Sequence, residues 1–162
     1  VAARSFGAKA YITDIAADKV ELAVREFHLD GGFINRSEED LTRFTHEITG
    51  DDGFDVTVEA VGAPSTFLNC VDAAASQGRV VVIGVAKHSA DFNFLALQRK
   101  ELNMFGIAGP QADFAATMQL VRDGFVDLTR LISRTYSVQD AASAFQDMDQ
   151  HSAQIVKAEF EF

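Results

Sequence analysis

The chain has 162 residues, 48% of them hydrophobic and 10% aromatic, which is enough for one ordinary domain with a sizeable core. Its 14 basic and 24 acidic residues give a formal charge of −10, the wrong sign for binding nucleic-acid phosphates. The one cysteine, Cys70, excludes an internal disulfide and favours a reducing, cytoplasmic compartment. No apolar run reaches the roughly 18 residues of a membrane span, and residues 1–6 are too short to be a signal peptide, so we expect no membrane partner.

The first predicted elements are a strand that ends in an acid and the helix that follows it. The apolar run at residues 10–13 leads to Asp14, and apolar side chains with helical period then mark residues 17–29 as a helix. Strand, terminal acid and helix form the second half of a dinucleotide-binding βαβ unit, in which the acid accepts hydrogen bonds from the adenosine ribose. A helix N-cap is the alternative role for Asp14. Residues 1–6 are interpreted as the tail of a helix that ends at Gly7.

The remaining elements are predicted from turn residues and hydrophobic periodicity. Gly31 and Gly32 are expected to turn the chain into a short strand at residues 33–35. Ser37 with Asp40 resembles a capping box at the start of a helix. The further predicted strands cover residues 54–60, 79–85, 102–107, 131–136 and 155–162, and the predicted helices cover residues 37–50, 64–76, 112–124 and 137–148. The strand at 79–85 has no polar alternation, so it should be central and buried on both faces, with 102–107 at an edge after a polar loop.

Small residues follow three of the predicted strands. They are Ala60-Val61-Gly62, Gly84-Val85 and Ile107-Ala108-Gly109. Ligands of open α/β sheets bind at the carboxyl ends of the strands, and small residues are needed where a ligand touches the backbone. We therefore expect these positions to face a ligand and to tolerate substitutions that stay small. The alternative is that the glycines merely turn the chain.

Four segments together resemble a known family. They are Asp14-Ile15 followed by Asp18-Lys19, then Asp55 to Gly62, Gly78 to Val85, and Arg99-Lys100-Glu101-Leu102. In this order and spacing the chain, from Val1 to Phe162, resembles the cofactor-binding half of the zinc-type medium-chain alcohol and polyol dehydrogenases. The Arg-Lys-Glu-Leu segment leans toward the polyol and sugar-acid branch of that family.

The resemblance implies an α/β fold with a doubly wound parallel sheet of the Rossmann type. Residues 1–124 would form an NAD-binding domain whose first strand and glycine-rich turn are missing from this chain. Residues 125–162 would be a tail that returns to a GroES-like catalytic domain, also missing. The zinc ligands and catalytic residues would lie in that domain, so we expect none here. Metal-ligand spacing is also lacking among the histidines, which are His28, His46, His88 and His151.

The resemblance further implies which residues contact the cofactor. They are Asp14, Ile15, Lys19, Ala60, Val61, Gly62, Gly84, Val85, Ile107, Ala108 and Gly109. Asp14 would hold the ribose hydroxyls, and Ile15-Ala16 supply no arginine for a 2′-phosphate, so NAD is favoured over NADP. Lys19 would contact the ribose, or else be an ordinary surface lysine. Main-chain groups at the ends of the last two sheet strands would bind the nicotinamide carboxamide.

The predicted function is the NAD-binding portion of a zinc-dependent oxidoreductase that moves hydride between a secondary alcohol, polyol or sugar acid and NAD. The resemblance adds a homodimer or homotetramer joined through the edge strand 102–107. One alternative is a zinc-free quinone or enoyl reductase of the same superfamily, whose usual preference for NADPH disagrees with Asp14. Another is a regulatory nucleotide-binding module without catalysis. Without the glycine-rich turn, the isolated chain is expected to bind NAD no tighter than millimolar.

Overall fold

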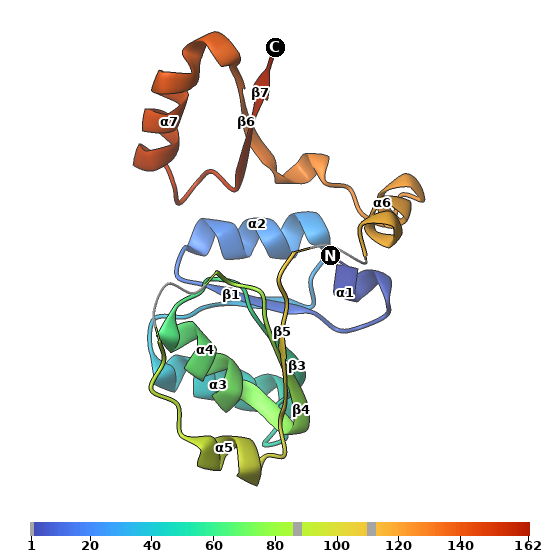
Figure 1. The fold of residues 1–162 in the computed structure, drawn as a ribbon, viewed down its shortest axis with the longest axis vertical. Coiled ribbons are helices and arrows are strands. Elements are labelled where there is room, and N and C mark those ends of the chain that lie inside the picture. The colour runs from blue at the N-terminus through green and yellow to red at the C-terminus, as the bar shows by residue number, and fades with distance from the viewer. Residues whose placement is uncertain (1, 86–88, 110–112) are drawn as a thin grey trace. The chain divides into compact units, whose positions relative to one another are not determined.

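The computed structural model describes residues 2–85, 89–109 and 113–162. The chain divides into two compact units, which are treated separately: unit 1 comprises Val1–Ile34 with Gln111–Phe162, and unit 2 comprises Asn35–Pro110. Figure 1 labels their helices and strands. Every pair of strands in the described residues is parallel, as predicted for an α/β protein. Within those residues no helix is both long and apolar enough to cross a membrane.

Unit 1 begins with a strand–helix–strand motif. Its elements are α1 (Ala2–Ser5), β1 (Tyr11–Asp14), α2 (Ala17–Phe27) and β2 (Gly31–Ile34). The predicted strand and helix are confirmed, but the prediction that Gly31 and Gly32 form a turn is wrong, because both lie within β2 and pair with β1. A Cβ atom at Gly32 would lie 2.5 Å from Val20 Cγ1 and 2.8 Å from Val24 Cγ2. Glycine at this position therefore lets α2 pack directly on the strand.

The C-terminal part of unit 1 contains a second pair of parallel strands. Its elements are α6 (Phe114–Arg122), η1 (Thr129–Leu131), β6 (Ile132–Ser137), η2 (Val138–Asp140), α7 (Ala141–Gln150) and β7 (Lys157–Glu161). Tyr136 on β6 donates a hydrogen bond of 2.6 Å to the Asp147 carboxylate on α7. In β7 exposed charged residues alternate with half-buried Ala158 and Phe160, so the predicted strand with one solvent-facing side is confirmed.

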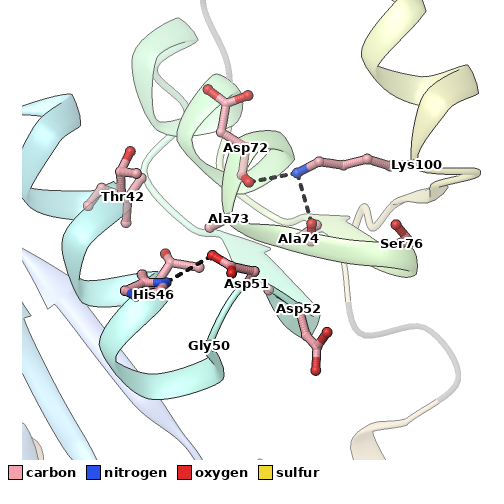
Figure 2. A pocket seen from close by; sticks show the side chains of 13 residues that line it. Thr42, His46, Gly50, Asp51, Asp52, Asp72, Ala73, Ala74, Ser76 and Lys100 are labelled. Atoms are coloured by element: carbon pink, nitrogen blue, oxygen red, sulfur yellow. Dashed lines mark hydrogen bonds and ion pairs between the residues drawn. The ribbon is translucent and has the colours of Figure 1, made fainter.

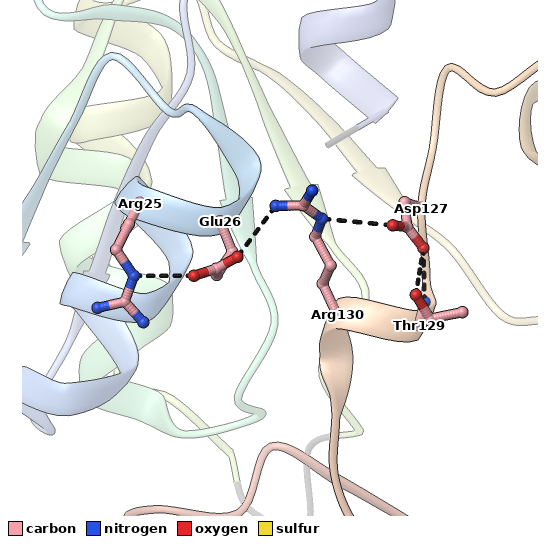
Figure 3. A network of polar contacts seen from close by, with 5 residues as sticks. All are labelled: Arg25, Glu26, Asp127, Thr129 and Arg130. Atoms are coloured by element: carbon pink, nitrogen blue, oxygen red, sulfur yellow. Dashed lines mark hydrogen bonds and ion pairs between the residues drawn. The ribbon is translucent and has the colours of Figure 1, made fainter.

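An exposed chain of charges in unit 1 joins α2 to the segment around η1 (Figure 3). The Arg130 guanidinium lies 3.0 Å from Glu26 Oε2 and 3.3 Å from Asp127 Oδ2. Arg25 Nε donates to the other Glu26 oxygen at 2.8 Å. The hydrogen bond from Arg25, with smaller contributions from Arg130, holds the pKa of Glu26 below its ordinary value. Because these side chains meet water, the network contributes little stability.

Unit 2 is built around three parallel strands. Its elements are α3 (Glu38–Thr49), β3 (Phe54–Glu59), α4 (Pro64–Ala73), β4 (Ala74–Val82), α5 (Phe94–Arg99) and β5 (Asn103–Gly106). The strand order is β3-β4-β5, which confirms that the Val80 strand is central and that β5 lies at an edge of this sheet. Figure 1 shows α3 and α4 side by side, and α4 also packs on β3 and β4. Val71, Ala74, Val80 and Leu102 form the buried core.

The helix ends in unit 2 agree with the prediction in one place and differ from it in two. Ser37 Oγ accepts a hydrogen bond from the Asp40 amide at 3.1 Å, so the predicted cap is confirmed. The helix predicted for residues 64–76 stops at Ala73 instead. The predicted polar loop contains α5, whose N-cap Asn93 accepts a bond from the Leu95 amide at 2.9 Å. Apolar residues of α5 pack against the core, and this packing stabilises a helix too short to be stable by itself.

One face of the unit 2 sheet is largely uncovered. Along β3, buried Thr57 and Glu59 alternate with Val56 and Val58, which are 44% and 53% exposed, and Phe105 on β5 is 47% exposed. On β4 Val80 is fully buried whereas Val81 is only half-buried. The prediction that this strand is buried on both faces therefore holds for one face only, because no helix among the described residues of unit 2 packs on the other face.

Candidate functional site

The first part of the candidate site is the turn between β1 and α2 in unit 1. Asp14 is the last residue of β1, and its Oδ1 accepts a hydrogen bond from the Ala16 amide at 2.9 Å. Ala16, not Asp14, occupies the N-cap position of α2, and no side chain caps that helix. Asp14 is thus not the helix cap of the alternative interpretation. Ile15 beside it is 78% exposed, and Lys19 is half-buried one turn along α2.

The second part of the site lies at the carboxyl ends of β3 and β4 in unit 2. Glu59, the last residue of β3, has only 2% of its surface exposed. Its Oε1 accepts hydrogen bonds from the Val61 amide at 2.9 Å, the Gly62 amide at 2.8 Å and the Thr66 hydroxyl at 2.7 Å. This single oxygen therefore fixes the loop that runs from β3 into α4.

Gly84 brings the end of β4 against the same loop. The amides of Ile83 and Gly84 both donate to the Glu59 carbonyl oxygen, at 2.9 and 3.1 Å. A Cβ atom at Gly84 would lie 2.8 Å from the Val61 nitrogen and would overlap the Gly62 nitrogen and Glu59 Oε2. The expectation that small side chains are tolerated is wrong at Gly84, because even a methyl group would push the two loops apart.

The three hydrogen bonds to Oε1 of the buried Glu59 carboxylate come from two backbone amides and a hydroxyl, and none of them comes from a basic side chain. Burial raises the pKa of Glu59, but the hydrogen bonds from Thr66 and from the Gly62, Val61 and Gly84 amides outweigh burial and leave the pKa below its ordinary value. The charge of Glu59 also reaches Cys70 on α4. Burial first, and this charge second, raise the pKa of the Cys70 thiol to about 11, as befits the small core residue that the sequence predicts.

The third loop follows β5, the edge strand. Ile107 donates its amide to the Val82 carbonyl at 2.9 Å, so the backbone pairing continues one residue past the strand. The side chain of Ile107 is 53% exposed, and a Cβ atom at Gly109 would meet no atom within 4 Å. Ala60 to Gly62, Gly84-Val85 and Ile107 to Gly109 thus share one edge of one sheet. Asp14, Ile15 and Lys19 belong to the other unit, so the predicted residues form two parts.

A hollow of about 220 Å³ lies elsewhere in unit 2 (Figure 2). It is lined by residues that precede β3 and β5, including Asp51 and Lys100, and by the end of α4. Its position at the amino ends of the strands is opposite to the edge where α/β sheets bind ligands. His46 and Asp51 pair there at 3.0 Å, both largely exposed. The hollow does not coincide with the predicted site.

The sequence interpretation missed Glu59, although it stands within one of the quoted segments. The available signal was an acid in an otherwise β-branched strand, directly before the small residues of a strand end. In the described part of the chain, no three His, Cys, Asp or Glu side chains come together as a metal site would require. His88 lies outside the described residues, together with Ala86 and Lys87.

Comparison with known proteins gives the following relatives. A model of the family described as zinc-binding dehydrogenase matches residues 1–123. An L-threonine 3-dehydrogenase of Rhizobium johnstonii is 29% identical over 150 residues, which cover 91% of this chain and 43% of that protein. A 2-dehydro-3-deoxy-L-galactonate 5-dehydrogenase of Pseudoalteromonas atlantica is 27% identical, covering 91% of this chain and 42% of that protein. The chain therefore spans less than half the length of these relatives.

Solved structures show the same fold. The L-idonate 5-dehydrogenase of Escherichia coli superimposes with a TM-score of 0.82 and 21% identity, over 99% of this chain and 45% of that one. The 2R,3R-butanediol dehydrogenase of Bacillus subtilis gives a TM-score of 0.83 and 21% identity, over 97% of this chain and 45% of that one. These likenesses confirm the predicted Rossmann-type fold class.

Proposed function

This chain belongs to the zinc-binding dehydrogenase family, as its motifs predicted, and we propose that it is the NAD-binding part of an NAD-dependent, zinc-dependent alcohol or polyol dehydrogenase. The substrate would be a secondary alcohol, a polyol or a sugar acid. The observation that supports NAD as the cofactor, and not NADP, is the position of Asp14 at the end of β1 with Ile15 after it. A carboxylate accepts ribose hydroxyls and repels a 2′-phosphate, and no arginine stands beside it to reverse that preference.

The residues of unit 2 fit the other half of the cofactor. The Glu59-held loop and Gly84 leave backbone, without side-chain bulk, at the ends of β3 and β4. A flat ring and its carboxamide need such close access to main-chain groups. When bound, NAD supplies the hydride acceptor, and the chain's own part is to hold and orient it. Lys19 would add a contact at the adenosine side.

The remainder of the proposal concerns the whole protein. Residues 1–124 would form the NAD-binding domain, and residues 125–162 would complete a separate catalytic domain that carries the zinc. Support comes from the separate sheet that β6 and β7 form, since two parallel strands alone are marginally stable. We place the enzyme in the cytoplasm and expect a homodimer or homotetramer joined through β5.

The test is the cofactor preference of the complete enzyme. Replacing Asp14 with Gly should lower the ratio of kcat/KM for NAD to that for NADP by at least about tenfold, equivalent to ~1.4 kcal/mol. The control, Asp18→Asn, removes a negative charge from the exposed start of α2 and should leave the ratio unchanged. An unaltered ratio in the Asp14 variant would remove Asp14 from the site.

Two other outcomes point to the alternative functions. A wild-type enzyme without bound zinc that prefers NADPH would be a quinone or enoyl reductase. Nucleotide binding without turnover of any alcohol would indicate a regulatory module. Metal analysis of the purified protein, together with a panel of secondary alcohols and polyols, separates these outcomes.

A further inference from the structure

We propose that Glu59 is the positioning residue for the nicotinamide half of the site, an inference that rests on the proposed NAD-binding function. Among the described residues, the largest fully buried side chains are those of Glu59, Val71 and Val80. A buried charge costs much free energy unless hydrogen bonds satisfy it. Those bonds come from the residues that surround the proposed nicotinamide contacts, and not from a distant structural element.

The two oxygens of the Glu59 carboxylate contact different parts of the structure. Oε1 gathers three donors from the β3–α4 loop, and Oε2 faces Gly84, whose amide also stabilises the ionised form. A glutamine has only one acceptor oxygen and carries an NH₂ group in place of the other. Glutamine would therefore keep one acceptor for the β3–α4 loop, but it would replace the oxygen beside Gly84 with an NH₂ group and lose the charge that the Thr66, Val61 and Gly62 donors stabilise.

The direction of these bonds determines what the loop presents to a ligand. The Val61 and Gly62 amides point inward to Glu59. Because the peptide unit is planar and trans, the carbonyl groups of the same two peptides, those of Ala60 and Val61, point away from Glu59. The loop thus offers acceptors, held by a side chain that does not itself touch the ligand. Moving Glu59 would rotate those acceptors.

The test compares a ligand that reaches this loop with one that does not. In the complete enzyme, the dissociation constants of NADH and of ADP are measured by calorimetry for the wild type, Glu59→Gln and Asp55→Asn. ADP contains the adenosine half alone. Asp55 is an exposed acid on the same strand, so its variant removes the same charge without disturbing the loop. We expect Glu59→Gln to weaken NADH at least about tenfold, or ~1.4 kcal/mol, with ADP changed less than about twofold and Asp55→Asn unchanged for both.

If the Glu59 variant does not fold, the variants Thr66→Val and Thr66→Ser test the same proposal. Valine removes one donor to Oε1 and should weaken NADH selectively by about threefold, whereas serine keeps the hydroxyl and should restore wild-type affinity. Equal weakening of NADH and ADP would show a general structural role and overturn the proposal, as would no weakening of either. A wild-type enzyme that binds neither ligand would overturn the proposed function itself.

Discussion

The Nζ of Lys100 lies 2.7 Å from the carbonyl oxygen of Asp72, in the last turn of α4. It also donates to the carbonyl of Val71 at 3.1 Å and to that of Ala74 at 2.9 Å. Figure 2 shows the bonds to Asp72 and Ala74. A helix leaves its last carbonyls without intrahelical partners, and an ammonium group there satisfies them. Lys100 is thus the cap that ends α4.

Replacing Lys100 with Met should destabilise the protein by about 1.5–3 kcal/mol, because methionine keeps the apolar stem but removes hydrogen bonds from a charged donor. Urea unfolding monitored by circular dichroism measures the change. Lys157→Met, at an exposed position on β7, is the control and should stay within about 0.5 kcal/mol of wild type. Equal effects of the two variants would mean that Lys100 acts only through its charge.

Gly32→Ala should cost about 1–3 kcal/mol, because the added methyl would force Val20 and Val24 of α2 away from β2. Gly106→Ala is the matched control, since it adds the same methyl to a strand where nothing lies within 4 Å. The midpoints of thermal unfolding should fall for Gly32→Ala only. If both variants melt with the wild type, α2 does not pack on β2 in solution.

The contribution of Glu59 to stability should depend on pH. Its folded pKa lies below the value of about 4.3 expected for an unfolded chain, so the ionised form adds stability that is full above that pH and is lost as the pH falls through the folded pKa. The difference in unfolding free energy between the wild type and Glu59→Gln should therefore be largest near about pH 7 and shrink near about pH 3. Urea titrations at the two pH values measure it, and a constant difference would contradict the assignment.

Gly106→Pro should separate oligomers if they join through β5. The Ile107 amide donates to Val82, and amide direction alternates along a strand, so the Gly106 amide faces the free edge while the Phe105 amide faces β4. Proline at 106 removes an edge donor only. Sedimentation should show monomers for Gly106→Pro and oligomers for Gly106→Ala, which keeps the amide. Oligomers in both would place the interface elsewhere.

The elements of this fold that follow from local pattern were predictable from the sequence. Asp14 after a short apolar run, Ser37 with Asp40, and the uninterrupted valines around Val80 each specify their own element. The wrong predictions concern elements whose structure depends on contacts with residues distant in the sequence. Gly31 and Gly32 resemble a turn in the sequence because the requirement for small residues comes from other parts of the chain, from Tyr11 at Gly31 and from Val20 and Val24 at Gly32.

The same limit applies to the candidate site. The small residues at the ends of three strands do lie at one edge of the sheet, and they were found from the sequence because that signal is local. The role of Glu59 depends on donors from α4 and on the approach of Gly84, which no spacing in the sequence reveals. The only sign of this arrangement in the local sequence is a single acid at the end of a β-branched strand.

The cap on α4 has a consequence for the order of folding. Lys100 stands 28 residues beyond Asp72, whose carbonyl it binds in the last turn of α4. That turn therefore gains its partner only after the intervening β4 and α5 segments have closed a long loop. The first turn of α4, with Pro64 at its start, depends on local residues alone. We therefore expect Lys100→Met to accelerate unfolding and to leave the folding rate nearly unchanged.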